Sequence, residues 1–344
     1  MDPISQAVLG ASLSQTFAKN KASQLSAMTI GALAAMAPDL DIFIRSSVDP
    51  LLTLEFHRQF THALIFIPLG ALVCAIVFYF FINLVGFWRA NLNRGLTFLQ
   101  VYWFSFLGYA THGFLDANTS YGTQLLWPFS NERIAWNTIS VVDPLFTLPI
   151  LILIILSVSR RTKRYATIAF IYAMVYLSLG VFQHQRAEAS LIELAQKRGH
   201  IIERMQVKPS FANRHVWKML YEHNGYYYVD AVKFLLDKQI FPGESIAKLN
   251  VDKDLAWLNK ESQSAKDIER FRWFSDDYLA LYPSMSNYII DVRYSLLPNS
   301  IRPLWGIQIK SSTINNNELE THVDFITNRN RDLKTREMFI DMLF

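Results

Sequence analysis

Histidine and aspartate residues gather in four short motifs of this 344-residue chain. The motifs are Pro38-Asp39-Leu40-Asp41, His57-Arg58-Gln59-Phe60-Thr61-His62, His112-Gly113-Phe114-Leu115-Asp116 and Val142-Asp143-Pro144. Imidazole and carboxylate ligands without cysteine suit Zn²⁺, Mn²⁺ or Fe. The single cysteine, Cys74, supplies neither a disulfide nor a thiolate metal site. The residue types therefore predict a divalent metal centre with nitrogen and oxygen ligands.

The spacing within the motifs restricts how their side chains can converge. His112 and Asp116 are four residues apart, so a helix places both on one face with about 6 Å of axial rise between them. His57 and His62 converge only if His57 lies at a helix start or in the loop before it. Asp39 and Asp41 point together only in an extended or turn conformation. We predict one or two ions, Zn²⁺ first and Mn²⁺ or Fe as alternatives, held by Asp39, Asp41, His57, His62, His112 and Asp116.

Such a centre most simply activates water for hydrolysis, with a nearby carboxylate as proton acceptor. The candidate acceptors are Asp41, Asp143 and Asp2, and Arg58 is the candidate for binding an anionic or phosphorylated group. The chain has no Gly-x-Ser-x-Gly elbow, Walker loop or dinucleotide fingerprint, which excludes serine hydrolase, NTPase and dehydrogenase classes. Two other hypotheses stay open: an ion-coupled transporter that uses the cluster as a proton relay or substrate site, and a scaffold that acts through its C-terminal part.

Long apolar runs indicate that these motifs are positioned by membrane helices. Hydrophobic residues make up 51% of the chain and charged residues only 18%. Residues 59–88, 95–115 and 165–185 contain no Asp, Glu, Lys or Arg, and two shorter runs cover 22–38 and 144–159. These runs predict five spans, and a sixth is expected in the more polar residues 3–18, although whether 1–18 span is left open.

Basic residues in short loops set the expected orientation, because Lys and Arg are retained in the cytoplasm. The loops carry Lys19 and Lys21, then Arg89 and Arg94, then Arg160, Arg161, Lys163 and Arg164, and with six spans they share one face. The ligand motifs and the C-terminus then lie on the opposite, periplasmic or extracellular face. The net charge of +4 is small and spread out, so nucleic acid is not an expected partner. The position of the motifs beside membrane helices makes membrane lipids and a lipid-like substrate the expected partners.

The predicted fold class is a polytopic α-helical membrane domain of about six helices, residues 1–185, followed by a soluble α+β domain, residues 186–344. Within the second domain, residues 186–204 have helical spacing of apolar residues. Residues 288–294 and 305–309 resemble strands of a hairpin, with its turn at Pro298 to Pro303. We expect Asp49 and Glu55 to be solvated loop residues.

Taken together, the motifs resemble a known family. With Met1-Asp2-Pro3-Ile4, Gly10 and the run from Val142 to Pro149, they are similar to the YdjM-like membrane-bound metal-dependent hydrolases. The resemblance extends into the C-terminal domain through Trp217, Gly225 to Tyr228 and Asp291 to Tyr294. It implies a multi-pass protein of the bacterial inner membrane with hydrolase activity, but no substrate. Two positions depart from the family pattern: Ser5-Gln6 replaces Thr-His, and Trp136-Asn137 replaces Trp-Asp.

Overall fold

The computed structural model forms two compact units. It describes residues 1–18, 21–88, 96–235, 237–310, 321–328 and 333–344. The first unit contains Met1–Phe43, Phe56–Gln183 and Phe211–Arg214. The second contains Ile44–Glu55, His184–Ser210 and His215–Phe344. Their division near residue 184 falls inside one long helix.

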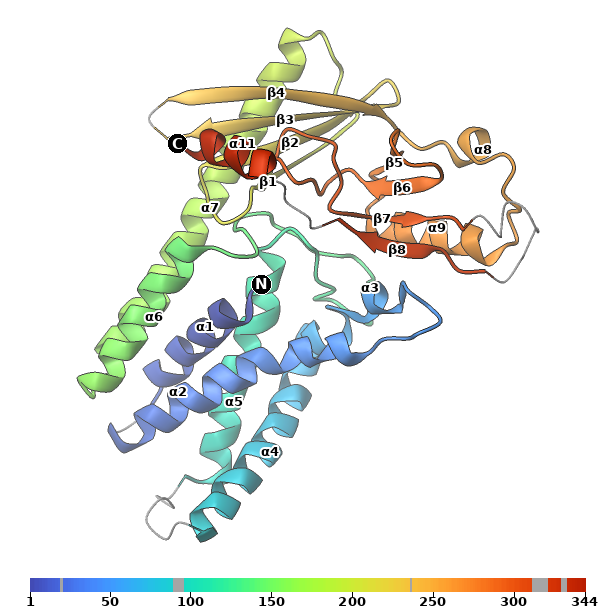
Figure 1. Ribbon diagram of the computed structural model, residues 1–344. Helices are drawn as coiled ribbons and strands as arrows, with labels where there is room; N and C mark the ends of the chain where they lie inside the picture. Colours follow the sequence, from blue (N-terminus) through green and yellow to red (C-terminus); the bar gives the residue numbers. More distant parts are fainter. Residues whose placement is uncertain (19–20, 89–95, 236, 311–320, 329–332) are drawn as a thin grey trace. The chain divides into compact units, whose positions relative to one another are not determined.

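The first unit is helical (Figure 1). Its helices are α1 (Pro3–Thr16), α2 (Lys21–Met36), α4 (Ile67–Trp88), α5 (Phe98–Ala117), α6 (Pro144–Ser159) and the first part of α7 (Arg164–Lys197). Three 3₁₀ segments, η1 (Ala37–Phe43), η2 (Phe60–His62) and η3 (Leu64–Phe66), lie between α2 and α4. The side chains of Asp2, Thr97 and Asp143 accept backbone N–H bonds at the starts of α1, α5 and α6. Such N-caps stabilise helix ends whose first N–H groups lack partners.

Three segments among the described residues are long and apolar enough to cross a membrane. They are Ser23–Phe43, Leu64–Leu84 and Arg164–Lys197, while α6 is apolar but shorter. The expectation of about six spans is therefore not supported. Helix α1 has only 14 residues and buries polar side chains such as Gln6 and Gln15, and α5 carries the polar ligand motif. Lys19, Arg89 and Arg94 lie outside the described residues, so the predicted orientation stays a prediction.

Glycines allow α1, α2 and α5 to cross with their backbones in contact. A Cβ atom added to Gly10 would lie 2.6 Å from the carbonyl oxygen of Gly31, and one added to Gly108 would lie 2.8 Å from the Cα of Gly31. Small residues permit such close helix packing in membranes, where dispersion contacts replace the hydrophobic effect. The crossing sets α5 against the end of α2, which is where the ligand motifs meet.

We expect Gly108→Ala to lower the thermal midpoint of the purified protein in detergent. Alanine is the better helix former, but its methyl group would overlap the backbone of α2, and overpacking costs about 1–3 kcal/mol. Leu99→Ala, at a 62% exposed position of the same helix, is the control and should shift the midpoint less. An unchanged midpoint for Gly108→Ala would contradict the close crossing.

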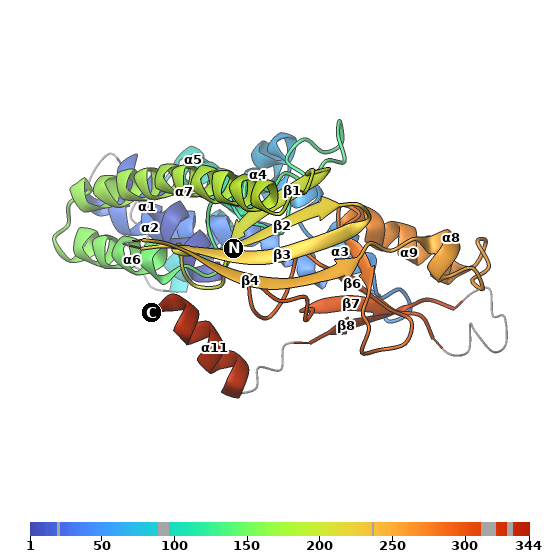
Figure 2. The ribbon, with the colours of Figure 1, turned by 90° about the horizontal axis from the view of Figure 1, so that it is seen from above.

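The second unit contains two antiparallel four-stranded sheets. The first has the order β1 (Arg204–Pro209), β2 (Val216–His223), β3 (Tyr226–Phe234) and β4 (Lys238–Ala247), visible side by side in Figure 2. The second consists of β5 (Leu279–Leu281), β6 (Tyr288–Asp291), β7 (Trp305–Gln308) and β8 (Asp324–Thr327). The remaining helices are α3 (Leu52–Phe56, in which Phe56 belongs to the first unit), α8 (Val251–Asp254), α9 (Gln263–Phe274) and α11 (Leu333–Leu343).

The structure confirms one prediction for the second unit and differs from two others. The hairpin is confirmed, because β6 pairs antiparallel with β7. The helix expected over 186–204 ends earlier, at Lys197, where Gly199 adopts a left-handed φ of 70° that ends helices. The solvated state expected for Asp49 and Glu55 is wrong. Arg270 binds both carboxylates, with Nη2 2.8 Å from Asp49 and Nε 2.6 Å from Glu55.

Two buried lysines are neighbours on adjacent strands of the first sheet. Lys208 on β1 pairs in register with Lys218 on β2, and both side chains are buried. The Nζ of Lys218 donates to Ser295 at 2.6 Å, whereas the Nζ of Lys208 has no hydrogen-bond acceptor and lies 3.2 Å from the ring centroid of Tyr294. Burial lowers the pKa of Lys218 to about 7 and holds the pKa of Lys208 well below its usual value.

This burial predicts a pH-dependent stability. Unfolded lysine binds a proton below about pH 10.4, whereas folded Lys218 does so only below about pH 7. Because the unfolded chain then holds more protons, stability falls as the pH drops from 10 to 7 and the loss is complete below that range. We expect Lys218→Met to weaken the fall of the thermal midpoint between pH 9 and pH 7. The exposed Lys266→Met is the control, and equal slopes in both variants would contradict the assignment.

Candidate metal centre

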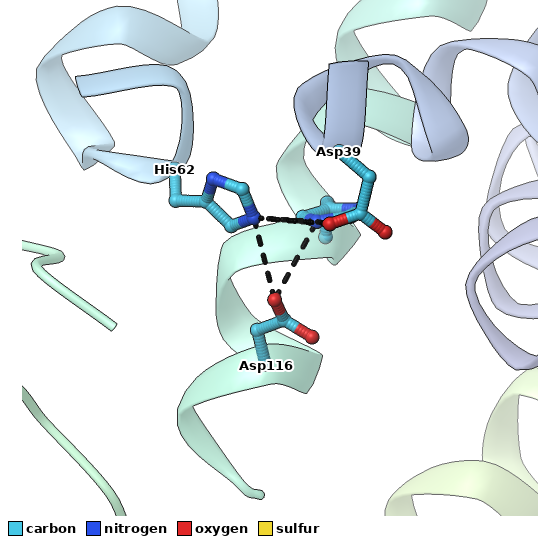
Figure 3. Close-up of side chains that lie close together, drawn as sticks. Asp39, His62 and Asp116 are labelled. Atoms are coloured by element: carbon cyan, nitrogen blue, oxygen red, sulfur yellow. Dashed lines mark hydrogen bonds and ion pairs between the residues drawn. The ribbon is translucent and has the colours of Figure 1, made fainter. Parts of the chain in front are cut away.

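The ligand motifs lie on three elements of the first unit. Segment η1 carries Asp39 and Asp41, η2 carries His62, and α5 carries His112 and Asp116. The predicted helical spacing of four residues does place His112 and Asp116 on one face of α5. Figure 3 shows the side chains of Asp39, His62 and Asp116 pointing toward one another from their separate elements.

A first group of four ligand atoms surrounds one point: Asp39 Oδ1, His62 Nε2, His112 Nε2 and Asp116 Oδ2. The Asp39 oxygen lies 3.5 Å from the nitrogen of His62 and 3.4 Å from that of His112. The Asp116 oxygen lies 3.3 and 3.6 Å from the same two nitrogens. Tetrahedral zinc ligands at about 2.0–2.2 Å from the ion are about 3.3–3.6 Å from one another. These four separations therefore match a tetrahedral site, and only the 2.8 Å between the two nitrogens is shorter.

Hydrogen bonding on the far side of each ring fixes which nitrogen is free. The Nδ1 of His112 lies 2.5 Å from the carbonyl oxygen of Ala35, so it carries the proton and donates it. The Nδ1 of His62 lies 3.3 Å from Asp41 Oδ2, an arrangement common behind metal-binding histidines. The two Nε2 atoms lie 2.8 Å apart and share one proton, and a cation that replaced this proton would be bound by both nitrogens.

The chemistry of the donor set also suits a cation. Among the described residues, the buried Oδ2 of Asp116 and the buried Oε1 of Gln6 accept no hydrogen bond, and the Asp116 oxygen has only charged or ionisable groups near it, with Arg58 Nε at 2.9 Å. Buried polar atoms without hydrogen-bond partners are rare, and each one calls for an ion, a water or a catalytic role. Two carboxylates held this close repel, and a divalent cation between them would remove that repulsion. The residues present thus fit a divalent metal ion.

A second group contains Asp39, Asp41 and His57, each with one ligand atom within 4.8 Å of the others. The Nδ1 of His57 lies 2.7 Å from Asp41 Oδ1. The other oxygen of Asp41 accepts hydrogen bonds from the backbone N–H of Arg58 at 3.0 Å and the hydroxyl of Thr61 at 2.9 Å. All six predicted ligands thus lie together, but they form two groups that share Asp39.

Arg58 is part of the centre and is buried. Its Nε lies 2.9 Å from Asp116 Oδ2, and its Nη1 donates to Thr119 at 2.9 Å. The backbone of Arg58 has a left-handed φ of 68°, an unfavourable conformation for a side chain of this size, and such strain clusters at functional sites. The guanidinium faces a ligand carboxylate, so its role in binding a substrate anion stays a prediction.

Asp2 and Asp143 lie outside both ligand groups of the described residues. The carboxylate of Asp2 caps α1 and accepts from the backbone N–H of Ser5 at 3.0 Å. The carboxylate of Asp143 caps α6, and both of its oxygens lie 2.9 Å from the hydroxyl of Tyr176. Of the three carboxylates expected to accept a proton, only Asp41 belongs to a ligand group.

Gln6 and Thr61 are residues of the centre that the motif analysis did not assign. The Nε2 of Gln6 donates to Asp116 Oδ1 at 2.9 Å, and the amino group of Met1 contacts the same oxygen. In the sequence, the departure from the family pattern at Gln6 was the feature that could have identified this residue as part of the centre. Thr61 lies between two predicted ligands in sequence, and only the structure reveals its contact with Asp41.

Metal content tests the first group directly. We expect His112→Ala to lower the affinity for Zn²⁺ more than 100-fold, and Asp41→Asn to lower it about 10- to 100-fold by releasing the ring of His62. Metal bound after dialysis would be measured by inductively coupled plasma mass spectrometry. His223→Ala, in the second unit, is the control. Equal metal content in His112→Ala and the control would remove the assignment.

One comparison with known proteins finds a match. A family model described as YdjM inner membrane protein matches residues 1–187, more than half of the 344 residues and every member of both ligand groups. No curated protein and no solved structure matches the chain. The match confirms the resemblance drawn from the motifs. The chain belongs to the YdjM inner membrane protein family.

Proposed function

We propose that this protein is a membrane-bound metal-dependent hydrolase that cleaves an ester or phosphoester of a lipid or another envelope component at the periplasmic face. The observation that carries the proposal is the first ligand group, in which one atom from each of two imidazoles and two carboxylates lies within 4.8 Å of the others. Buried ionisable groups beside membrane segments are costly and are retained for function.

The exposed side of the centre indicates where a substrate would enter. The side chains of His62, His112 and Asp116 are fully buried, whereas Asp39 is 27% exposed and His57 19% exposed. A scissile bond can therefore approach from the side of Asp39 and His57. A divalent cation supplies an activated water there, because Zn²⁺ lowers the pKa of a bound water to about 7. With one ion in the centre, the hydrogen-bonded pair of Asp41 and His57 lies on that side and can accept a proton.

The position of the ligands relative to the spans supports a substrate at the membrane surface. Asp39 and Asp41 lie at the end of the candidate span Ser23–Phe43, and His62 lies just before the next one, Leu64–Leu84. The connection between them holds no further candidate span, so these ligands belong at one membrane surface. We place this surface and the C-terminal sheets in the periplasm, because the basic cluster of residues 160–164 opens the third candidate span and basic residues favour the cytoplasm.

Hydrolysis can be tested with the purified protein in nanodiscs made from bacterial inner-membrane lipids. We expect mass spectrometry to detect a cleaved lipid, EDTA to stop the reaction, and Zn²⁺ or Mn²⁺ to restore it. His112→Ala should lower the rate at least 1,000-fold, while His223→Ala should retain it. Movement of an intact solute across the bilayer, without any cleaved product, would contradict hydrolysis and favour the transporter hypothesis.

A further inference from the structure

The second ligand group lies on the open side of the first. We propose that Asp39, Asp41 and His57 bind a second divalent cation, with Asp39 as a bridging carboxylate, and that this cation binds together with a phosphate group of the substrate. The inference rests on the proposed function and narrows its substrate class to phosphoesters.

The atoms needed for a bridged pair of ions are available. Asp39 Oδ1 faces the two imidazoles of the first group at 3.4 and 3.5 Å, so its second oxygen remains for another ion. In Asp41, Oδ2 accepts hydrogen bonds from Arg58 and Thr61, and the hydrogen-bond partner of Oδ1 among the described residues is the ring of His57. The 2.7 Å contact between Asp41 and His57 holds one proton, which a cation bound to both residues would replace. Two ions in hydrolytic sites are typically about 3.5–4 Å apart.

The two groups differ in the number and the exposure of their ligands. The first group offers four protein ligands, three of them fully buried, so an ion there would gain a water only as a fifth ligand on the side of Asp39. The second offers three ligands, of which Asp39 and His57 are partly exposed. Sites with three protein ligands keep a position for water or substrate, as catalytic zinc sites do. The substrate would therefore meet the second cation first.

Charge requires the second cation to arrive with an anion. Three carboxylates, those of Asp39, Asp41 and Asp116, face two cations, Arg58 and the amino group of Met1. A first divalent ion turns this net charge positive, and a second adds a positive excess that a partly buried site tolerates poorly. The guanidinium of Arg133 adds to the excess, because it lies 5.1 Å from the ring of Tyr121, which itself packs against His57. A phosphate dianion offsets this charge.

Linkage makes the proposal measurable, because phosphate must raise the affinity of the second cation by the same factor as that cation raises the affinity for phosphate. The test titrates Mn²⁺ into the metal-free full-length protein, with and without inorganic phosphate, and follows free and bound Mn²⁺ by electron paramagnetic resonance. Without phosphate, we expect the protein to bind one equivalent of Mn²⁺ tightly. With phosphate, a second equivalent should bind at least tenfold more tightly than it does without phosphate, and the spectrum should show the multiline signal of two exchange-coupled Mn²⁺ ions.

Variants separate the two groups. His57→Ala should lose only the second equivalent and the coupled signal, whereas His112→Ala should lose the first and His223→Ala should lose neither. One equivalent at every phosphate concentration, two uncoupled ions, or a second equivalent that survives His57→Ala would each overturn the proposal. Hydrolysis with one ion would leave the proposed function intact and refute only the second site. Coupled binding without cleavage of any ester would refute the function and leave the second site standing.

Discussion

Two imidazole nitrogens and two carboxylate oxygens lie within 4.8 Å of one another in a largely buried space. Carboxylates held this close repel, and burial strengthens the repulsion because water cannot screen it. The surrounding structure serves to keep them together. The glycine crossing of α1, α2 and α5 sets the backbone distances, and Arg58 offsets part of the negative charge. A cation converts this arrangement from a cost into a stabilising contact.

The sequence predicted which His and Asp side chains come together, because the motifs consist of single residues at short spacings. His112 and Asp116 needed only helical periodicity. The separation of His57 from His62 into two groups was not predictable, since it depends on the left-handed backbone at Arg58 that turns the chain between them. Asp2 and Asp143 cap helices, and because aspartate is a favoured N-cap as well as a proton acceptor, a sequence alone does not separate the two uses.

Local sequence patterns were less able to predict the membrane spans and the contacts between residues far apart in the chain. A charge-free run predicted a span at residues 95–115, but α5, which carries His112 and Asp116, is not among the candidate spans of the described residues. The strands of the second unit were visible in part, as in the hairpin of β6 and β7, whereas the grouping into two sheets depends on contacts between distant strands. Asp49 and Glu55 appeared solvated because their partner, Arg270, is more than 200 residues away in the chain.

The ion pairs of Arg270 affect the order in which the candidate metal centre forms during synthesis of the chain. Most of the segment between Asp41 and His57, Ile44–Glu55, is part of the second unit, where Arg270 binds two of its carboxylates. A nascent chain that has already emerged through Asp116 possesses every ligand but lacks the arginine that fixes this connection. Until α9 has been synthesised, Asp49 and Glu55 lack their partner. The connection between Asp41 and His57 therefore reaches its final conformation only after the second unit has folded.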